Sequence, residues 1–250
     1  FWVVYFSSVL ALNFWVAVLL GVLLSALIGV VIERTMLRPM VGKPAFSVAI
    51  LTIGLNIALT VIGFDLIGVE IRSLGDPWGI QVVEIGPLVV SRKDVATIVA
   101  SVVVVGALLA FFRYSRFGLA MRATAVDQET ALAQGIPVAR VFAVAWAMAA
   151  GLATIAGVFL GAGTGVTAAI GVRAIRALPA AVIGGLDSIP GAIVGGLIVG
   201  LAEAYTVAYQ AEYLGFLGQN FSTAVAYVVM FFVLLVRPYG IFGTREVVRV

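Results

Sequence analysis

The chain has 250 residues, of which 63% are hydrophobic and only 11% charged, and its formal net charge is +3. A mean hydropathy of +1.19 excludes a soluble globular protein and indicates an integral membrane protein. The absence of Cys and His excludes thiol chemistry, disulfides, imidazole bases and the common zinc or haem ligand sets.

The apolar segments are long and rich in Gly, Ala, Val and Leu, which favours membrane-spanning helices over the short alternating strands of a β-barrel. The chain opens on an apolar stretch, 1–6, without a charged flank, and we interpret it as the end of a span whose beginning is missing. A turn at 7–13 leads into the first complete span, which we place at Phe14–Ile32.

The next segment, 33–44, is basic and contains two prolines, so the positive-inside rule makes it a cytoplasmic loop. The second span follows at 45–64 and carries a small polar cluster of Thr52, Gly54 and Asn56. Asparagine is costly in lipid, so Asn56 either forms a hydrogen bond to another helix or lines a transport pathway.

On the opposite side of the membrane we expect a loop at 65–94 with charges of both signs. Its segments 80–85 and 88–90 flank Gly86-Pro87 and predict a small β-hairpin. This loop either caps the helix bundle or contacts a delivery protein.

Between the third span, 95–112, and the fourth, 141–160, lies a long polar loop, 113–140. No Gly or Pro occurs from Leu119 to Gln134 and Ala is abundant there, so we predict a helix within the loop. Gly135 followed by Pro137 predicts that this helix stops at a glycine in the left-handed conformation.

The predicted loop helix presents one face of small and apolar side chains. The helix is therefore either a solvated connector or the docking surface for a partner protein. The residues that recur on that face are Leu119, Ala123, Val126, Thr130 and Ala133.

The distribution of basic residues tests this orientation. Only Arg72, Arg92 and Lys93 fall in the expected outer loop, and the bias supports cytoplasmic placement of the other loops and the tail. The basic residues on the expected inner side are Arg34, Arg38, Lys43, Arg113, Arg116, Arg122, Arg140, Arg237, Arg245 and Arg249.

The fourth span ends on the outer side of the membrane, and the last apolar helix, Phe221–Val236, is expected to return to a cytoplasmic tail. The segment 161–220 must therefore cross the membrane an even number of times. Pro179 and Pro190 are expected to interrupt helices, with the polar pair Asp187-Ser188 between them. Broken or re-entrant helices are tolerated only beside protein or a water-filled cavity, so we place the pathway here. The candidate pathway residues are Asn56, Gly184, Gly185, Asp187, Ser188 and Gly191.

In the same region glycines recur at a spacing of four residues, which lets helix backbones approach closely. The pattern predicts helix packing within the chain or a subunit interface. The pairs are Gly157/Gly161, Gly191/Gly195 and Gly196/Gly200. Glu203 lies late in the same segment. Its side chain either forms an ion pair, lines a vestibule or extends to the membrane interface.

The loop at 113–140 contains Glu129-Thr130-Ala131, three further residues and then Gly135. It resembles the cytoplasmic loop of permease subunits of bacterial ABC importers, whose signature is Glu-Ala-Ala, three residues, then Gly. In that family the loop forms a coupling helix that sits in a cleft of the ATPase subunit. The departures are Thr130 for the middle alanine, and Ala145, Ala147 and Met148 where the signature continues with Ile-x-Leu-Pro.

Further motifs carry a wider pattern: Gly118-Leu119-Ala120-Met121-Arg122-Ala123, Asp127, Ala131, Gly135-Ile136, Ala180-Ala181-Val182-Ile183-Gly184-Gly185-Leu186-Asp187-Ser188-Ile189-Pro190-Gly191-Ala192 and Arg237-Pro238-Tyr239-Gly240-Ile241-Phe242-Gly243. This pattern resembles the permeases of high-affinity branched-chain amino acid transporters, and the smaller of their two permease types. The resemblance implies that the ATPase-coupling residues are Arg122, Ala123, Asp127, Glu129, Ala131 and Gly135.

The resemblance also implies partners: two cytoplasmic ATPase subunits, a second homologous permease subunit, and a periplasmic binding protein that delivers Leu, Ile, Val or a related small amide or amino acid. It implies a multi-pass protein of the bacterial inner (cytoplasmic) membrane, in contact with the lipid bilayer. Nucleic acid is not expected as a partner, because the basic residues are spread between spans rather than gathered in one patch.

The predicted fold is all-α, a polytopic transmembrane bundle with broken or re-entrant helices in its C-terminal third, forming one permease domain, 1–250, that includes the loop 113–140. The one Gly-Lys, at Gly42-Lys43, lacks the context of a phosphate loop, so we expect a transport subunit without enzyme activity or cofactor. A self-contained secondary transporter or channel is the alternative, with Glu203 or Asp187 as its carboxylate. A membrane enzyme would need paired catalytic residues that the chain does not offer.

Overall fold

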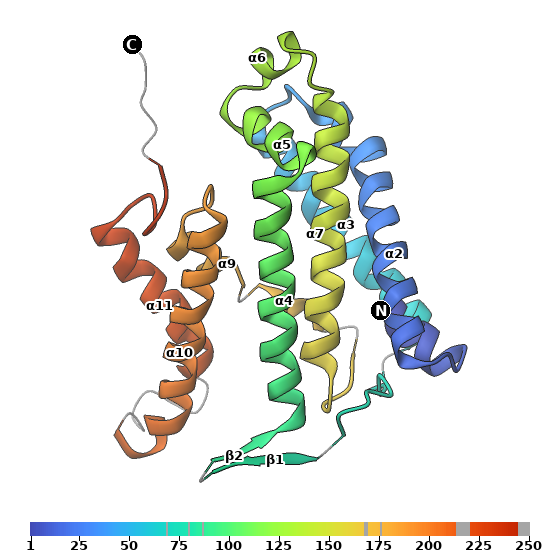
Figure 1. Cartoon of the computed structure of the whole chain (residues 1–250), viewed down its shortest axis with the longest axis vertical. Coiled ribbons are helices and arrows are strands. Elements are labelled where there is room, and N and C mark those ends of the chain that lie inside the picture. Colours follow the sequence, from blue (N-terminus) through green and yellow to red (C-terminus); the bar gives the residue numbers. More distant parts are fainter. Residues whose placement is uncertain are drawn as a thin grey trace. The chain divides into compact units, whose positions relative to one another are not determined.

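The computed structural model (Figure 1) describes residues 1–68, 70–79, 81–86, 88–167, 170–175, 177–213 and 221–244. Most of these residues are helical, which confirms the predicted all-α class. The chain divides into two compact units, residues 1–170 and 171–250.

The first unit consists of helices and one hairpin. Its elements are α1 (Trp2–Val4), a π-helical turn (Tyr5–Val9), α2 (Phe14–Ile32), a second π-helical turn (Glu33–Leu37), a 3-10 turn (Arg38–Met40), α3 (Ala45–Ile67), β1 (Val82–Ile85), β2 (Leu88–Ser91), α4 (Arg92–Tyr114), α5 (Arg116–Val126), α6 (Gln128–Ala133) and α7 (Val138–Gly161). The second unit begins within α8 (Ile170–Ala174) and contains α9 (Ala177–Gly184), α10 (Ile189–Tyr213) and α11 (Phe221–Val236).

Among the described residues, five helices are long and apolar enough to cross a membrane, which confirms the four spans predicted before residue 161 and adds α10. The first predicted span coincides with α2, and the second begins where α3 begins. The predicted hairpin is also confirmed: β1 and β2 pair antiparallel, with Val82 opposite Ser91 and Ile85 opposite Leu88.

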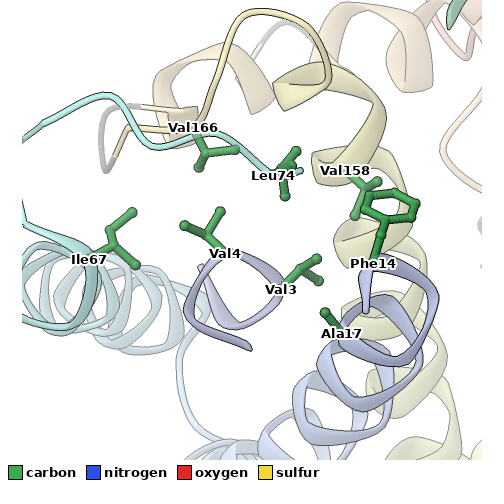
Figure 2. Close-up of a cluster of buried hydrophobic side chains, with 8 residues drawn as sticks. All are labelled: Val3, Val4, Phe14, Ala17, Ile67, Leu74, Val158 and Val166. Carbon is green, nitrogen blue, oxygen red and sulfur yellow. The ribbon is translucent and has the colours of Figure 1, made fainter. Parts of the chain in front are cut away.

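α2 and α7 pack closely against each other. A Cβ on Gly29 of α2 would lie 2.7 Å from the Trp146 carbonyl of α7, so only glycine allows this approach. At the other end of the pair lies the buried apolar core of the unit, drawn in Figure 2. Its residues are Val3, Val4, Phe14, Ala17, Ile67, Leu74, Val158 and Val166.

Two connections lie at opposite ends of α4 (Figure 1). The β1–β2 hairpin precedes its first residue, and α5 and α6 follow its last. A helix of this length crosses a bilayer at about 1.5 Å per residue, so the arrangement is consistent with the two sides predicted for the loops.

In the second unit α9 and α10 form a tight antiparallel hairpin. A Cβ on Gly184 would overlap the Gly191 carbonyl, and one on Gly195 would overlap the Ala180 carbonyl. The two backbones are therefore in contact at two positions along the helices. This confirms the prediction that the Gly191/Gly195 pair serves helix packing within the chain.

The expectation that prolines interrupt helices in this region is wrong. Pro179 is the third residue of α9 and Pro190 the second of α10, so both lie in a first turn. The amide that proline lacks has no helical partner there, and its fixed φ suits the start of a helix. The predicted breaks occur instead between α8 and α9 and between α9 and α10, while α10 is long enough to span a membrane.

The tail after α11 closes the α9–α10 turn. The amides of Ile241 and Phe242 donate to the carbonyls of Ile183 and Gly184, at 2.8 and 3.0 Å. These bonds satisfy carbonyls at the end of α9 that have no partner within the helix. Ile183 is completely buried and packs with Val199 of α10 and Ala226 of α11.

Candidate functional site

The loop between α4 and α7 is folded against the end of α4. The Ser115 hydroxyl caps α5 by accepting from the Gly118 amide at 2.8 Å. A Cβ on Gly118 would lie 2.5 Å from the Phe111 carbonyl, so the glycine lets α5 return directly onto α4. Met121 and Thr124 of α5 are buried. The loop is thus a packed structure rather than a free connector.

A single short helix was predicted within the loop, but the structure has two, because Asp127 separates α5 from α6. Asp127 is extended, with φ −157° and ψ 113°, and its carboxylate accepts from the amides of Glu129 and Thr130 at 2.9 and 3.1 Å. The Thr130 hydroxyl donates to the same carboxylate at 2.6 Å. An aspartate can therefore start a helix even where no Gly or Pro marks a break.

The hydrogen bonds that cap α6 favour the ionised form of Asp127. The hydroxyl of Thr130 contributes most, followed by the Thr130 amide, and together they lower the pKa of the Asp127 carboxyl from its usual value. The cap is therefore intact at neutral pH.

The end of α6 confirms the predicted left-handed glycine. Gly135 has φ +79°, and its amide donates to the Leu132 carbonyl at 2.9 Å. The Ile136 amide donates to the Ala131 carbonyl at 3.0 Å, which completes a Schellman cap. No heavy atom lies within 4 Å of a Cβ built on Gly135, so the need for glycine is conformational.

All six predicted coupling residues lie in this one folded loop, in different settings. Arg122, Asp127, Glu129 and Gly135 are exposed, and Ala123 is half-buried. Ala131 is buried and its carbonyl belongs to the helix cap, so it stabilises the loop instead of facing outward.

The loop also presents apolar side chains to the outside. Leu119, Val126 and Leu132 are 62%, 88% and 57% exposed. Leu119 and Val126 belong to the predicted docking face, which the break at Asp127 divides between two helices. Large apolar side chains that stay exposed on a polar loop are of the kind that partners cover.

A buried ion pair at the base of the loop was not found from the sequence. The Glu33 side chain is 4% exposed and lies 3.0 Å from Arg38, which donates to it through Nε and Nη2. Arg38 Nη2 also donates to the Ala139 carbonyl at the start of α7, at 3.0 Å. The pair therefore joins the end of α2 to the end of the loop. The signal available was an acidic residue at the end of a span, five residues before an arginine.

The polar residues predicted for the pathway cap and close the α9–α10 turn. The Ser188 hydroxyl accepts from the Gly191 amide at 3.1 Å and caps α10. The Asp187 carboxylate accepts from the Thr244 amide at 2.9 Å and from the Thr244 hydroxyl, and these two bonds lower the pKa of Asp187.

The glycines of that turn serve close packing: Gly184 and Gly191 touch, and Gly185 has φ +105° beside the backbone of Gly243. Asn56 belongs to the first unit, where it is exposed on α3, and within the described ranges its side chain forms no hydrogen bond. The structure thus brings together the five predicted residues that belong to the second unit. A pathway role stays a prediction.

Two further features bear on transport chemistry. The Oε1 atom of Glu203 on α10 is buried and has no hydrogen-bond partner in the part of the chain that the structure describes. Over the same residues, no group of three Asp or Glu side chains gathers closely enough to hold a metal ion. Gly196 and Gly200, the other spaced pair of α10, face open space and leave a face for another helix.

The fold and this loop define a multi-pass α-helical membrane protein with a folded connection between two of its spans. Residues 1–236 match the sequence pattern of the family described as branched-chain amino acid transport system / permease component. The chain belongs to this family of permease components.

Relatives carry matching descriptions. The high-affinity branched-chain amino acid transport system permease protein LivH of Escherichia coli is 34% identical over 58% of this chain and 45% of its own length. BraD of Pseudomonas aeruginosa, with the same description, is 42% identical over 30% of this chain and 22% of its length.

The probable branched-chain amino acid transport permease protein LivH of Methanocaldococcus jannaschii is 33% identical over 28% of this chain and 22% of its own length. The chain thus spans less than half the length of these curated relatives. No solved structure matches the chain.

Proposed function

We propose that the chain is the membrane-spanning permease subunit of an ATP-driven importer for branched-chain or related amino acids. The observation that carries the proposal is the α5–α6 loop: it is folded by its own caps, yet leaves Leu119, Val126 and Leu132 exposed. A docking surface needs both properties, a fixed shape and apolar side chains still open to a partner. Membership of the permease family supports the same function.

The assembly that we propose has two cytoplasmic ATPase subunits on the α5–α6 loops of this chain and of a second, homologous permease. A periplasmic binding protein delivers the amino acid, and the complex lies in the bacterial inner membrane. In this proposal residues 1–250 act as one permease domain. Substrate choice rests mainly with the binding protein.

The proposed mechanism is alternating access. ATP binding closes the ATPase pair and displaces the docked α5–α6 loop, and the permeases then rock to open the pathway to the other side. Arg38 joins two long helices where the loop ends, because it contacts Glu33 at the end of α2 and Ala139 in the first turn of α7, which directly follows the loop. A displacement of the loop is thereby passed to the closely packed α2–α7 pair.

The orientation is tested by labelling single cysteines, for which the Cys-free chain offers a clean background. A cysteine at Gln128 of α6 should react with a membrane-impermeant thiol reagent only from the cytoplasmic side. One at Asp76, before the β hairpin, should react only from outside. Reaction of both cysteines from the same side would contradict the topology.

Coupling is tested with Gly135→Val. A β-branched residue at φ +79° is strained by on the order of 1 kcal/mol or more, so the end of α6 should shift and misplace the docking surface. Gly106→Val is the matched control, since Gly106 of α4 also has open space around it but lies in a regular helix.

In reconstituted complexes with liganded binding protein, Gly135→Val should lose stimulated ATP hydrolysis and uptake together, while Gly106→Val retains both. Normal stimulation and uptake in Gly135→Val would contradict the coupling role. Co-purification of wild-type chain with the ATPases, tested in parallel, reports the docking itself.

A secondary transporter is the second candidate, because Glu203 provides a buried carboxylate oxygen without a hydrogen-bond partner among the described residues. That function predicts uptake by the reconstituted permeases in the absence of ATPase subunits, and loss of this uptake in Glu203→Gln. The ATP-driven function predicts no uptake without them.

A further inference from the structure

A cavity of about 510 Å³ lies in the first unit between the α2–α3 connection, α6 and α7. Ligand sites in proteins span roughly 300–1,000 Å³, so the cavity is large enough for part of a lipid-sized molecule. Nine of its twelve lining residues are apolar, and the other three are Glu33, Arg38 and Gln128. We call it the α6–α7 cavity.

The cavity extends from the loops into the membrane-spanning part of two helices. Val48 of α3 and both Phe142 and Trp146 of α7 line it, and all three lie inside candidate spans. Trp146 is eight residues beyond Val138, where the α7 span begins, which is about 12 Å along a helix. A side chain of a water-soluble partner that docks on α6 would have to enter the hydrocarbon region to fill this depth, whereas a lipid chain is already there.

Three basic residues adjoin, in the sequence, residues that line the loop end of the cavity. Arg34, Lys43 and Arg140 are exposed, each lies within two residues of a lining residue, and none has an acidic partner in the described part of the chain. The acidic residues nearby are otherwise engaged or lie on α6: Glu33 pairs with Arg38, and Asp127 and Glu129 flank Gln128.

We propose that the α6–α7 cavity binds one anionic phospholipid. Its acyl chain lies along Phe142 and Trp146, and its phosphate lies at the loop end beside Lys43 and Arg140. Apolar lining at membrane depth with unpaired Lys and Arg at the interface is the combination that recognises such lipids. The lipid would contact Leu132 and Gln128 where they line the cavity and so stabilise the position of the loop, while Leu119 and Val126 remain open to the ATPase subunit.

Trp146 makes the proposal testable by fluorescence. In a variant with Trp2, Trp15 and Trp78 changed to Phe, Trp146 is the single remaining tryptophan. This variant is reconstituted in phosphatidylcholine vesicles that contain increasing fractions of either phosphatidylglycerol or phosphatidylcholine with brominated chains. Brominated phosphatidylglycerol should half-quench Trp146 at a mole fraction about 30-fold lower than brominated phosphatidylcholine, the ratio that about 1 kcal/mol from each of Lys43 and Arg140 provides.

Matched variants then locate the site. Ala139→Phe fills the cavity and should abolish the preference for phosphatidylglycerol, while Ala145→Phe, on an exposed part of α7 outside the lining, should retain it. The double change Lys43→Gln and Arg140→Gln should also abolish it. Arg113→Gln with Arg116→Gln removes two exposed charges away from the lining and should leave the preference unchanged.

Equal quenching by the two brominated lipids would overturn the proposal, as would an equal loss of preference in both charge variants, which would indicate general surface attraction. If added ATPase subunits protect Trp146 from both lipids alike, the occupant is a protein and the proposal is wrong. Native mass spectrometry of the wild-type chain is a measurement independent of the variants. One retained phosphatidylglycerol molecule is expected. None is expected after exchange into micelles that contain phosphatidylcholine alone.

Discussion

The α5–α6 loop and the α9–α10 turn use the same chemistry with different partners. Each contains an aspartate whose carboxylate binds a threonine, and each contains a glycine with positive φ, Gly135 or Gly185. Asp127 binds Thr130, three residues along the chain, while Asp187 binds Thr244, 57 residues away.

This difference decides how much surface each region leaves open. In the α9–α10 turn the tail bonds to the end of α9 and Ile183 is completely buried. In the α5–α6 loop the caps are local, and Val126 remains 88% exposed. A loop that satisfies its polar groups locally keeps its shape and still offers apolar side chains, so a partner that covers them does not have to order the backbone first.

The largest test of this contrast compares one apolar truncation in each region. Ile183→Ala should lower the free energy of unfolding by about 2–5 kcal/mol, because it opens a cavity in a fully packed site. Val126→Ala should change it by less than about 0.5 kcal/mol, because the side chain packs against little. Unfolding in detergent micelles measures both. A similar loss in the two variants would break the distinction between an open loop and a closed turn.

The second test concerns the link at the base of the loop. Arg38→Ala leaves the buried Glu33 carboxylate unpaired and should destabilise the chain by about 3 kcal/mol, the low end for buried pairs, because Arg38 itself is partly exposed. Arg34→Ala, an exposed arginine without an acidic partner among the described residues, is the control. Adding Glu33→Gln to Arg38→Ala should restore part of the stability. If it restores none, the pair does not act as a unit.

Neighbouring glycines of α10 provide the third test. Gly195→Ala places a methyl group against the Ala180 carbonyl and should cost about 1–3 kcal/mol. Gly196→Ala meets open space and should be neutral or stabilising by up to about 1 kcal/mol, because alanine is the better helix former. The thermal midpoints of the purified chains distinguish the two. Equal midpoints would mean that α9 and α10 are not in backbone contact.

The smallest effect is a pH dependence of the two aspartate caps, both of which lie outside the candidate spans. Because hydrogen bonds lower the pKa of Asp127 and Asp187 in the folded chain, these bonds are fully present above the ordinary aspartate pKa, about 3.9, and are lost as the pH falls through the lower folded values. Acid should therefore lower the protection of the amides of α6 and of the tail, measured as hydrogen-exchange rates relative to the intrinsic rate at each pH.

Matched substitutions separate the two caps. Asp127→Asn keeps an oxygen acceptor, so the α6 amides should stay protected from hydrogen exchange and their protection should not depend on pH. Asp127→Ala removes the acceptor, so the α6 amides should lose protection at every pH. Thr244→Val should affect the tail alone. Faster exchange of α6 in Thr244→Val would contradict the local character of the α5–α6 caps.

Features set by nearby residues were predictable from the sequence. Span lengths, the β hairpin and the left-handed Gly135 follow from apolar runs and from Gly and Pro, which act on their immediate neighbours. The break at Asp127 is also local, but the surrounding alanines concealed it, since they favour a continuous helix.

Features that depend on distant partners could not be predicted in this way. No pattern near Arg38 indicates that its second acceptor is the Ala139 carbonyl, 101 residues away. The apparent pathway motif around Asp187-Ser188 likewise has capping roles that appear only when the tail is in place. These polar residues lie at helix ends, and a pathway role for them remains a prediction.

The tail bonds also have a consequence for biosynthesis. Ribosomes produce the chain from its N-terminus, so Ile183 and Gly184 enter the membrane well before the Ile241 and Phe242 amides that satisfy their carbonyls exist. Until then the end of α9 carries unpaired carbonyls, and the second unit is a nascent intermediate that insertion machinery or chaperones must tolerate. We therefore expect this unit to complete its folding after α9 has been inserted, when residues 241–244 bind to the α9–α10 turn.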